Sequence, residues 1–69
     1  MNRKPVTSSN IRSVGYDENS QTLEVEFNSN DVYQYLNVPA RIHVELMSAG
    51  SKGQYFIKNI KEVFEYRKV

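Results

Sequence analysis

The sequence predicts an α+β domain: a small three-stranded antiparallel sheet followed by two short helices packed on one face. Residues 22–28 alternate apolar and acidic side chains, which is typical of a strand with one buried face. Residues 39–49 repeat apolar side chains at helical spacing and end before a glycine, which indicates a helix and its stop. The chain has 69 residues and no cysteine, so a single core must stabilise it without disulfides.

The strands come first along the chain. Residues 1–7 are polar, and we expect them to form a loose leader ahead of a single domain over 8–69. The pattern over 11–17 predicts the first strand, and a cluster of turn residues ends it. The alternating segment forms the second strand, and 32–38 returns from a turn at 28–31 as the third.

The hairpin loop decides which way Tyr33 and Tyr35 point, because directly opposed residues of two strands share a face. An odd-numbered loop places both tyrosines beside the apolar residues of the preceding strand, and an even-numbered loop places them beside its glutamates. The apolar set is Leu23, Val25 and Phe27, and the acidic set is Glu24 and Glu26. Asn30 favours the odd loop, because asparagine tolerates the left-handed conformation that closes a three-residue loop. The even loop remains an alternative, since it would group Val32 and Leu36 with the apolar set.

The first helix is predicted over 39–49. Pro39 suits the first turn of a helix. One face of the following segment carries three apolar residues, Ile42, Leu46 and Ala49. Gly50 is a natural stop for this helix.

A second helix is predicted to begin at Ser51, because Ser51 and Gln54 have the spacing of a capping box. Its apolar stripe consists of Phe56, Ile60 and either Val63 or Phe64. The tail over 63–69 alternates like a strand and could return to the sheet as a short fourth strand. The alternative is that the helix continues to the end.

Charge is distributed unevenly, although the net charge is only +1. Residues 17–31 carry five acidic side chains and no basic one, whereas the segment from Ser51 onward is mainly basic. An anionic partner should therefore favour the carboxyl-terminal third. No apolar run approaches the length of a membrane span and no hydrophobic signal segment begins the chain, so we expect a soluble cytoplasmic protein with no membrane partner.

The residues for catalysis are scarce. His43, inside the predicted first helix, is the only histidine, and no conventional Ser-His-Asp triad can be assembled around it. Glu24 and Glu26 share a strand face that we expect to be a solvated surface. There is no glycine-rich phosphate loop. We therefore expect that the protein is not an enzyme and has no cofactor and no metal site.

Two features have a binding interpretation beside a structural one. The start of the second helix offers free backbone amides together with Ser51, Lys52 and Gly53, which suits a phosphate. A tight turn with a serine cap explains the same residues, and we favour it. Tyr33 and Tyr35 could stack on nucleotide bases, but the odd loop and the neighbouring carboxylates favour packing in the core.

The ordered segments of the chain together resemble the KTSC domain, from about Val6 to Lys68. The segments are SSNI (8–11), VGYD (14–17), LEVEF (23–27), YQY (33–35), VP (38–39) and SKGQYF…I (51–60). This domain takes its name from the carboxyl terminus of some lysyl-tRNA synthetases and also occurs as free-standing proteins. The resemblance implies no established activity, and it suggests RNA binding by association. The chain departs from the family pattern at Asn30, where glycine is frequent, and at Ile57, where a polar residue is common.

Two hypotheses of function follow. The first is an RNA-binding accessory module that uses the basic carboxyl-terminal third and aromatic side chains. Its candidate residues are Tyr33, Tyr35, Ser51, Lys52, Gly53, Tyr55, Lys58 and Lys61. The second is a module that binds another protein, or a second copy of itself, through an open edge of its short sheet.

Overall fold

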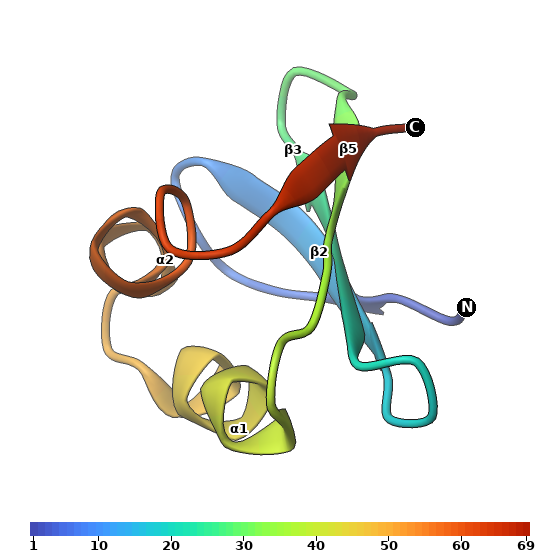
Figure 1. Ribbon diagram of the computed structural model, residues 1–69. Helices are drawn as coiled ribbons and strands as arrows, with labels where there is room; N and C mark the ends of the chain where they lie inside the picture. Colours follow the sequence, from blue (N-terminus) through green and yellow to red (C-terminus); the bar gives the residue numbers. More distant parts are fainter.

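A computed structural model describes residues 1–69 as one sheet with two helices on one side (Figure 1). The elements in chain order are β1 (Lys4–Pro5), β2 (Ile11–Asp17), β3 (Thr22–Phe27), β4 (Val32–Tyr35), α1 (Ala40–Ser48), α2 (Lys52–Asn59) and β5 (Tyr66–Lys68). The strands lie in the order β1-β2-β3-β4-β5, and every neighbouring pair is antiparallel. Both helices therefore lie between the two strands β4 and β5 in the chain.

The sheet has five strands, whereas the sequence predicted three and an optional fourth. The predicted tail strand exists as β5, which pairs with β4. The fifth strand comes from the predicted loose leader, because Lys4 and Pro5 of β1 pair with Val14 and Ser13 of β2. A strand of two residues has no periodicity, so only its pairing with β2 reveals it.

The hairpin between β3 and β4 has the odd loop that Asn30 favoured. Tyr35 lies opposite Leu23, and Tyr33 lies opposite Val25. Asn30 has a φ angle of 75°, in the left-handed region. The Phe27 amide donates to the Asp31 carbonyl at 2.9 Å, so the loop consists of residues 28–30. The prediction that both tyrosines share the face of the apolar residues is confirmed.

The core lies between this face of the sheet and the helices. Ten buried hydrophobic residues form it: Ile11, Val14, Leu23, Val25, Tyr35, Val38, Ile42, Leu46, Phe56 and Ile60. Helix α1 contributes Ile42 and Leu46, as its predicted face requires, and α2 contributes Phe56. The longer α1 has nine residues, and neither helix is long and apolar enough to cross a lipid bilayer.

Helix α2 ends at Asn59, which decides the point that the sequence left open. The amides of Ile60 and Lys61 both donate to the Phe56 carbonyl, so the chain turns there and does not continue as a helix. Ile60 is buried, and Phe64 packs against the core. Val63 is 63% exposed, so Phe64 is the residue that completes the apolar stripe.

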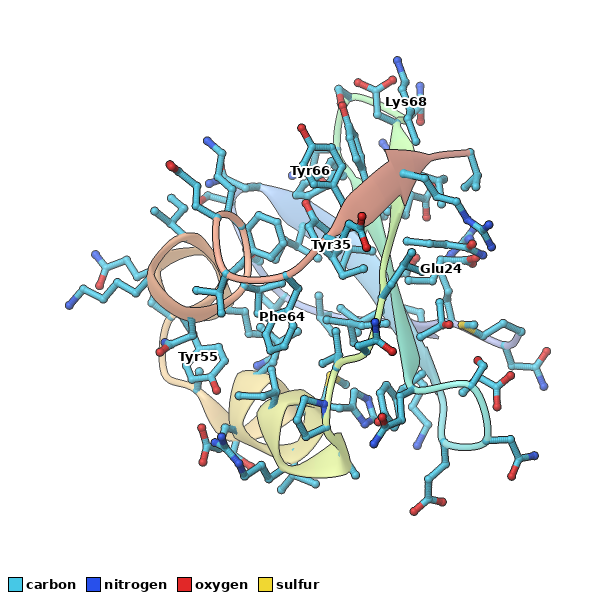
Figure 2. The ribbon with its side chains drawn as sticks, viewed as in Figure 1. Glu24, Tyr35, Tyr55, Phe64, Tyr66 and Lys68 are labelled. Carbon is cyan, nitrogen blue, oxygen red and sulfur yellow. The ribbon has the colours of Figure 1, made fainter.

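The face of the sheet opposite the helices is not the solvated acidic surface that we expected. A network of polar side chains crosses it from the residue before β1 to β5, through Arg3, Ser13, Glu24, Glu26, Gln34 and Arg67. Glu24 lies on the side of the sheet away from the helices (Figure 2). It is only 8% exposed and accepts hydrogen bonds from Arg3 and from Gln34. Desolvation would raise the pKa of Glu24, but these hydrogen bonds and the charge of Arg3 outweigh it and lower the pKa.

Gly15 allows the amino-terminal residues to cross this face. A Cβ atom at Gly15 would lie 2.9 Å from the Asn2 carbonyl oxygen and 3.0 Å from Cγ of Arg3. These distances are too short for a side chain, so glycine at this position makes room for Arg3 to reach Glu24. The segment expected to be loose is therefore packed on the sheet.

Candidate functional site

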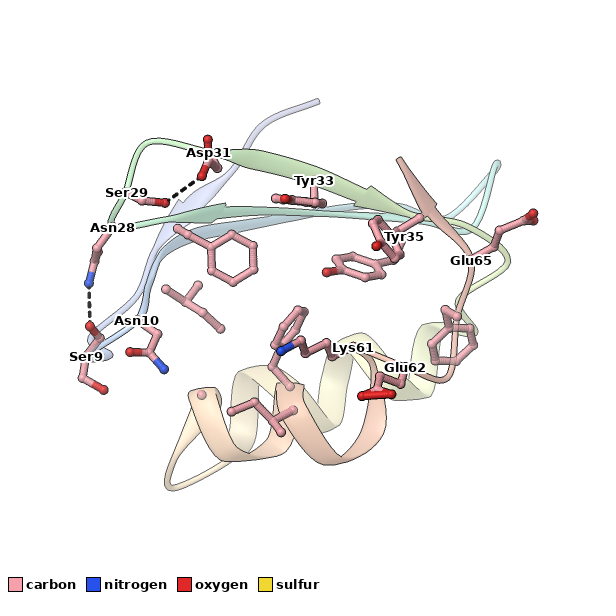
Figure 3. Close-up of a pocket in the computed structure, with 17 residues that line it drawn as sticks. Ser9, Asn10, Asn28, Ser29, Asp31, Tyr33, Tyr35, Lys61, Glu62 and Glu65 are labelled. Carbon is pink, nitrogen blue, oxygen red and sulfur yellow. Dashed lines mark hydrogen bonds between the residues drawn. The ribbon is translucent and has the colours of Figure 1, made fainter. Parts of the chain in front are cut away.

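A groove of about 980 Å³ lies between the inner face of the sheet and α2 (Figure 3). Six of its lining residues are aromatic: Phe27, Tyr33, Tyr35, Phe56, Phe64 and Tyr66. The strands β4 and β5 supply the three tyrosines, and α2 supplies Phe56 from the opposite wall. The groove is the candidate functional site, since ligand sites in proteins are concave and largely apolar with a few polar groups.

The three tyrosines of the groove form one aromatic surface. Tyr66 lies opposite Tyr35 in the β4–β5 ladder, which places a third ring beside the two on β4. The ring centroids of Tyr33 and Tyr35 are 6.4 Å apart, and that of Tyr66 lies 5.6 Å from each of them. Tyr35 also meets Phe56 edge to face at 5.4 Å, so the sheet and α2 hold the surface from two sides.

The hydroxyl groups of these three tyrosines have no hydrogen-bond partner within the protein. The other two tyrosine hydroxyls are engaged: Tyr16 donates to the Val38 carbonyl at 2.5 Å and Tyr55 donates to Glu45. Every fully buried polar side-chain atom of the protein has a hydrogen-bond partner. Because the three groove hydroxyls have none, they are not fully buried and are open to water or a ligand. Burial, and then the neighbouring tyrosines, raise the pKa of Tyr35 to about 12. It is therefore a neutral donor at ordinary pH.

Charged and polar side chains surround the groove. Asp31 is already engaged, because it accepts from Ser29 and lies 3.3 Å from Nζ of Lys68. The hydrogen bond from Lys68, then that from Ser29 and the charge of Lys68, lower the pKa of Asp31. Lys61, Glu62 and Glu65 also line the groove (Figure 3), and none of the three forms an ion pair. The groove thus offers one free cation and two free carboxylates.

The structure divides the residues that the sequence proposed as a site. Four of them line the groove: Tyr33, Tyr35, Gly53 and Lys61. Tyr35 is 4% exposed and Tyr33 is half-buried. Both tyrosines pack against the core and also line the groove, so the packing interpretation does not exclude contact with a ligand.

The other four candidates lie outside the groove. Ser51 caps α2, and its Oγ accepts from the Gln54 amide at 3.3 Å. Nζ of Lys52 donates to the Ala49 carbonyl at 3.5 Å. Tyr55 donates to Glu45 of α1 at 2.6 Å; burial and then this contact raise its pKa to about 12. Lys58 is exposed. The basic carboxyl-terminal third therefore does not converge on one point.

Sequence reasoning missed several residues of the groove. Tyr66 had a signal, since the tail alternates like a strand and places Tyr66 in register with Tyr35. Phe64 was named only as an alternative to Val63. Asn10 carried no signal, because its position in the groove depends on contact between the segment before β2 and Gly53 of α2.

His43, the single histidine, lies outside the groove. Its ring stacks on Tyr16 with centroids 4.9 Å apart, and the side chain is half-buried. Burial, and then the charge of Lys4, lower its pKa. No group of three or more histidine, cysteine, aspartate or glutamate side chains is placed to hold a metal ion.

Comparison with known proteins places this chain among relatives of two kinds. It is 46% identical to a lysine–tRNA ligase of Trichormus variabilis over 59 residues. This aligned segment covers 86% of this chain but only 10% of the ligase. The chain is 45% identical over 56 residues to an uncharacterized protein of Stutzerimonas stutzeri, which covers 81% of this chain and 79% of that protein.

A solved structure agrees with the fold along almost the whole chain. The crystal structure of a KTSC domain protein from Yersinia pestis superposes with a TM-score of 0.96 and 48% sequence identity, over 99% of this chain and 96% of that one. The model of the KTSC domain family matches residues 7–64. The chain belongs to the KTSC domain family.

Proposed function

We propose that this protein is a non-catalytic RNA-binding module that holds an unpaired base in the aromatic groove. The observation that carries the proposal is the surface formed by Tyr33, Tyr35 and Tyr66, whose hydroxyls are free, beside the unpaired Lys61. Stacking of a base on an aromatic side chain contributes about 1–3 kcal/mol, and hydroxyl groups can bond to its edge. The similarity to a part of lysine–tRNA ligases supports RNA, and tRNA in particular, as the ligand.

The charge distribution limits how the RNA can lie. Lys61, in the turn after α2, is the only cation that lines the groove, and Lys58 is exposed on α2 itself. These two lysines would meet the phosphates next to the bound base. With so few cations, the affinity should fall with salt as expected for about two to four phosphate contacts.

The test is a titration of labelled tRNA and of short single-stranded RNA at several salt concentrations. We expect binding that weakens with salt and NMR shifts at Tyr33, Tyr66 and Lys61. Lys61→Gln should weaken binding, whereas Arg41→Gln, which removes an exposed cation on α1, should leave it unchanged. Absence of RNA binding at low salt, or equal effects of the two substitutions, would refute the proposal.

Self-association through β5 is the second candidate function. The two cations of this edge strand point back to the protein, because Arg67 donates to Gln34 at 2.9 Å and Lys68 lies 3.3 Å from Asp31. Lysines on an edge strand commonly protect it from pairing with another chain. These two cations do not, because their charged groups are directed at the protein itself. Tyr66, the first residue of β5, is 56% exposed, and Val69, which follows the strand, is 60% exposed.

Light scattering across a range of protein concentrations tests this second function. The Glu65 carbonyl and the Val69 amide both bond toward β4, so the alternation of a strand directs the Lys68 amide to the free edge. We expect a dimer that Lys68→Pro abolishes, since proline has no amide hydrogen to donate. A wild-type protein that stays monomeric at every concentration would contradict edge pairing.

A further inference from the structure

One end of the groove carries a side-chain amide with no partner. Asn10 lines the groove, and no hydrogen bond of the protein uses its carboxamide. A Cβ atom at Gly53 would lie 3.3 Å from Nδ2 of Asn10, so the glycine of α2 leaves the space in which this amide lies. Figure 3 shows Asn10 beside α2 at the end of the groove away from Glu65.

A carboxamide offers a donor and an acceptor side by side. Asparagine binds adenine through two hydrogen bonds, in which the amide oxygen accepts from the base amino group and the amide nitrogen donates to a ring nitrogen. Adenine is also a large base, which favours stacking on aromatic rings. Among the bases, adenine therefore matches both the polar end and the aromatic lining of the groove.

The carboxylates at the other end limit the length of the bound RNA. Glu62 and Glu65 line the groove without an ion pair, and they would repel a phosphate backbone that ran past them. Lys61 is the one unpaired cation that lines the groove, which suits one phosphate inside it. Any further phosphate contact, such as one with Lys58, lies outside the groove. A run of stacked bases along the groove is therefore disfavoured, and one nucleotide fits.

We infer that the groove selects a single unpaired adenine, whose edge is bound by the carboxamide of Asn10. This inference rests on the RNA-binding function proposed above. The bidentate contact should give an affinity for adenine over uracil of about fivefold or more.

The experiment compares a short oligouridine, the same oligouridine with one central adenine, and an oligoadenine. We expect the single adenine to raise the affinity by about fivefold or more over the oligouridine. The oligoadenine should bind more tightly than the single-adenine oligomer only because it offers many equivalent binding sites. Asn10→Ala should remove the preference. The matched control is Asn19→Ala in the exposed turn after β2, which should retain it.

A second variant tests the same contact from the opposite side. Gly53→Ala places a methyl group at 3.3 Å from the Asn10 amide and should reduce the preference while Asn10 is still present. Circular dichroism of each variant shows whether it folds, so a lost preference in a folded variant is assigned to the contact.

The possible failures are distinguishable. Equal affinity for the oligouridine with and without adenine, or a preference that survives Asn10→Ala, would overturn the adenine inference and leave the RNA-binding proposal intact. No binding of any RNA would overturn both. An oligolysine peptide is the remaining arm, because aromatic rings and carboxylates also attract cations; tighter binding of the peptide than of any RNA would overturn both proposals in favour of a protein partner.

Discussion

Replacing Tyr35 by phenylalanine separates the two roles of this residue, because it removes the hydroxyl and keeps the ring. The ring is buried in the core and touches Phe56 edge to face. The hydroxyl has no partner within the protein. At neutral pH, Tyr35→Phe should therefore change the free energy of unfolding by less than about 0.5 kcal/mol, since no internal hydrogen bond is lost.

At high pH the same substitution should stabilise the protein relative to the wild type. Burial, followed by Tyr33 and Tyr66, raises the pKa of Tyr35 from 10.0 to about 12. The unfolded chain then releases its proton at lower pH than the folded protein. The stability that this pKa difference contributes to the folded protein is fully present below pH 10 and is lost as the pH rises toward 12. At pH 11 the wild type should have lost about 1 kcal/mol that the phenylalanine variant retains.

The assay is urea denaturation followed by far-ultraviolet circular dichroism, at neutral pH and at about pH 11. The wild type should lose more stability than Tyr35→Phe between the two conditions. Tyr55, whose pKa is also raised to about 12, contributes equally to both proteins and cancels in the comparison. Tyr66→Phe is the comparison variant: it removes a hydroxyl from a side chain that is 56% exposed. Because Tyr66 is the last of the causes that raise the pKa of Tyr35, this variant should reduce the alkaline loss less than Tyr35→Phe does.

The result that refutes this reasoning is an equal alkaline loss in the wild type and in Tyr35→Phe. It would mean that the hydroxyl of Tyr35 is as well solvated in the folded protein as in the unfolded chain. If Tyr35→Phe lowered the free energy of unfolding by more than about 1 kcal/mol at neutral pH, the prediction for neutral pH would be refuted. Such a loss would imply an internal hydrogen bond of the Tyr35 hydroxyl that the structure does not contain.

Three further predictions concern the sheet. Gly15→Ala should displace the amino-terminal residues from the sheet, because its Cβ would lie 2.9 Å from the Asn2 carbonyl. Faster hydrogen exchange of the Val6 amide, which donates to the Arg12 carbonyl at 3.0 Å, would show it. Gly50→Ala, which meets no atom within 4 Å, should leave that exchange unchanged. Glu24→Gln should destabilise the protein by about 1–2 kcal/mol at neutral pH. The effect of Glu24→Gln should shrink in acid, because the pKa of Glu24 is lowered in the folded protein. The stability that the ionised carboxylate contributes above its unfolded pKa is therefore lost as the pH falls through the folded pKa. Denaturation at neutral and at acid pH measures this, and an effect independent of pH would contradict the prediction. Asn30→Val should cost about 1–2 kcal/mol in thermal unfolding, because the φ angle of 75° disfavours a β-branched residue, whereas an unchanged melting temperature would show that the loop adopts another turn.

Local patterns in the sequence determined most of the fold. The alternation over 22–28 predicted β3, and the helical spacing before Gly50 predicted α1. A single residue, Asn30, favoured the loop length that places Tyr33 and Tyr35 on the inner face, and the structure confirms that placement. These features depend on backbone conformation and on periodicity within about ten residues, so they can be recognised before any tertiary contact is known.

Only the tertiary structure decided the edges of the sheet and the composition of the groove. Strand β1 has two residues, which is too short for a periodic signal. Alternation over 63–69 offered β5 only as one of two alternatives, and pairing with β4 decided it. Both strands exist because a neighbouring strand satisfies their backbone groups. The groove brings Asn10, Tyr33, Lys61 and Tyr66 together from distant parts of the chain, whereas Lys58 lies outside it despite being three residues from Lys61. A ligand contacts a surface in space, and the separation of residues along the chain does not define that surface.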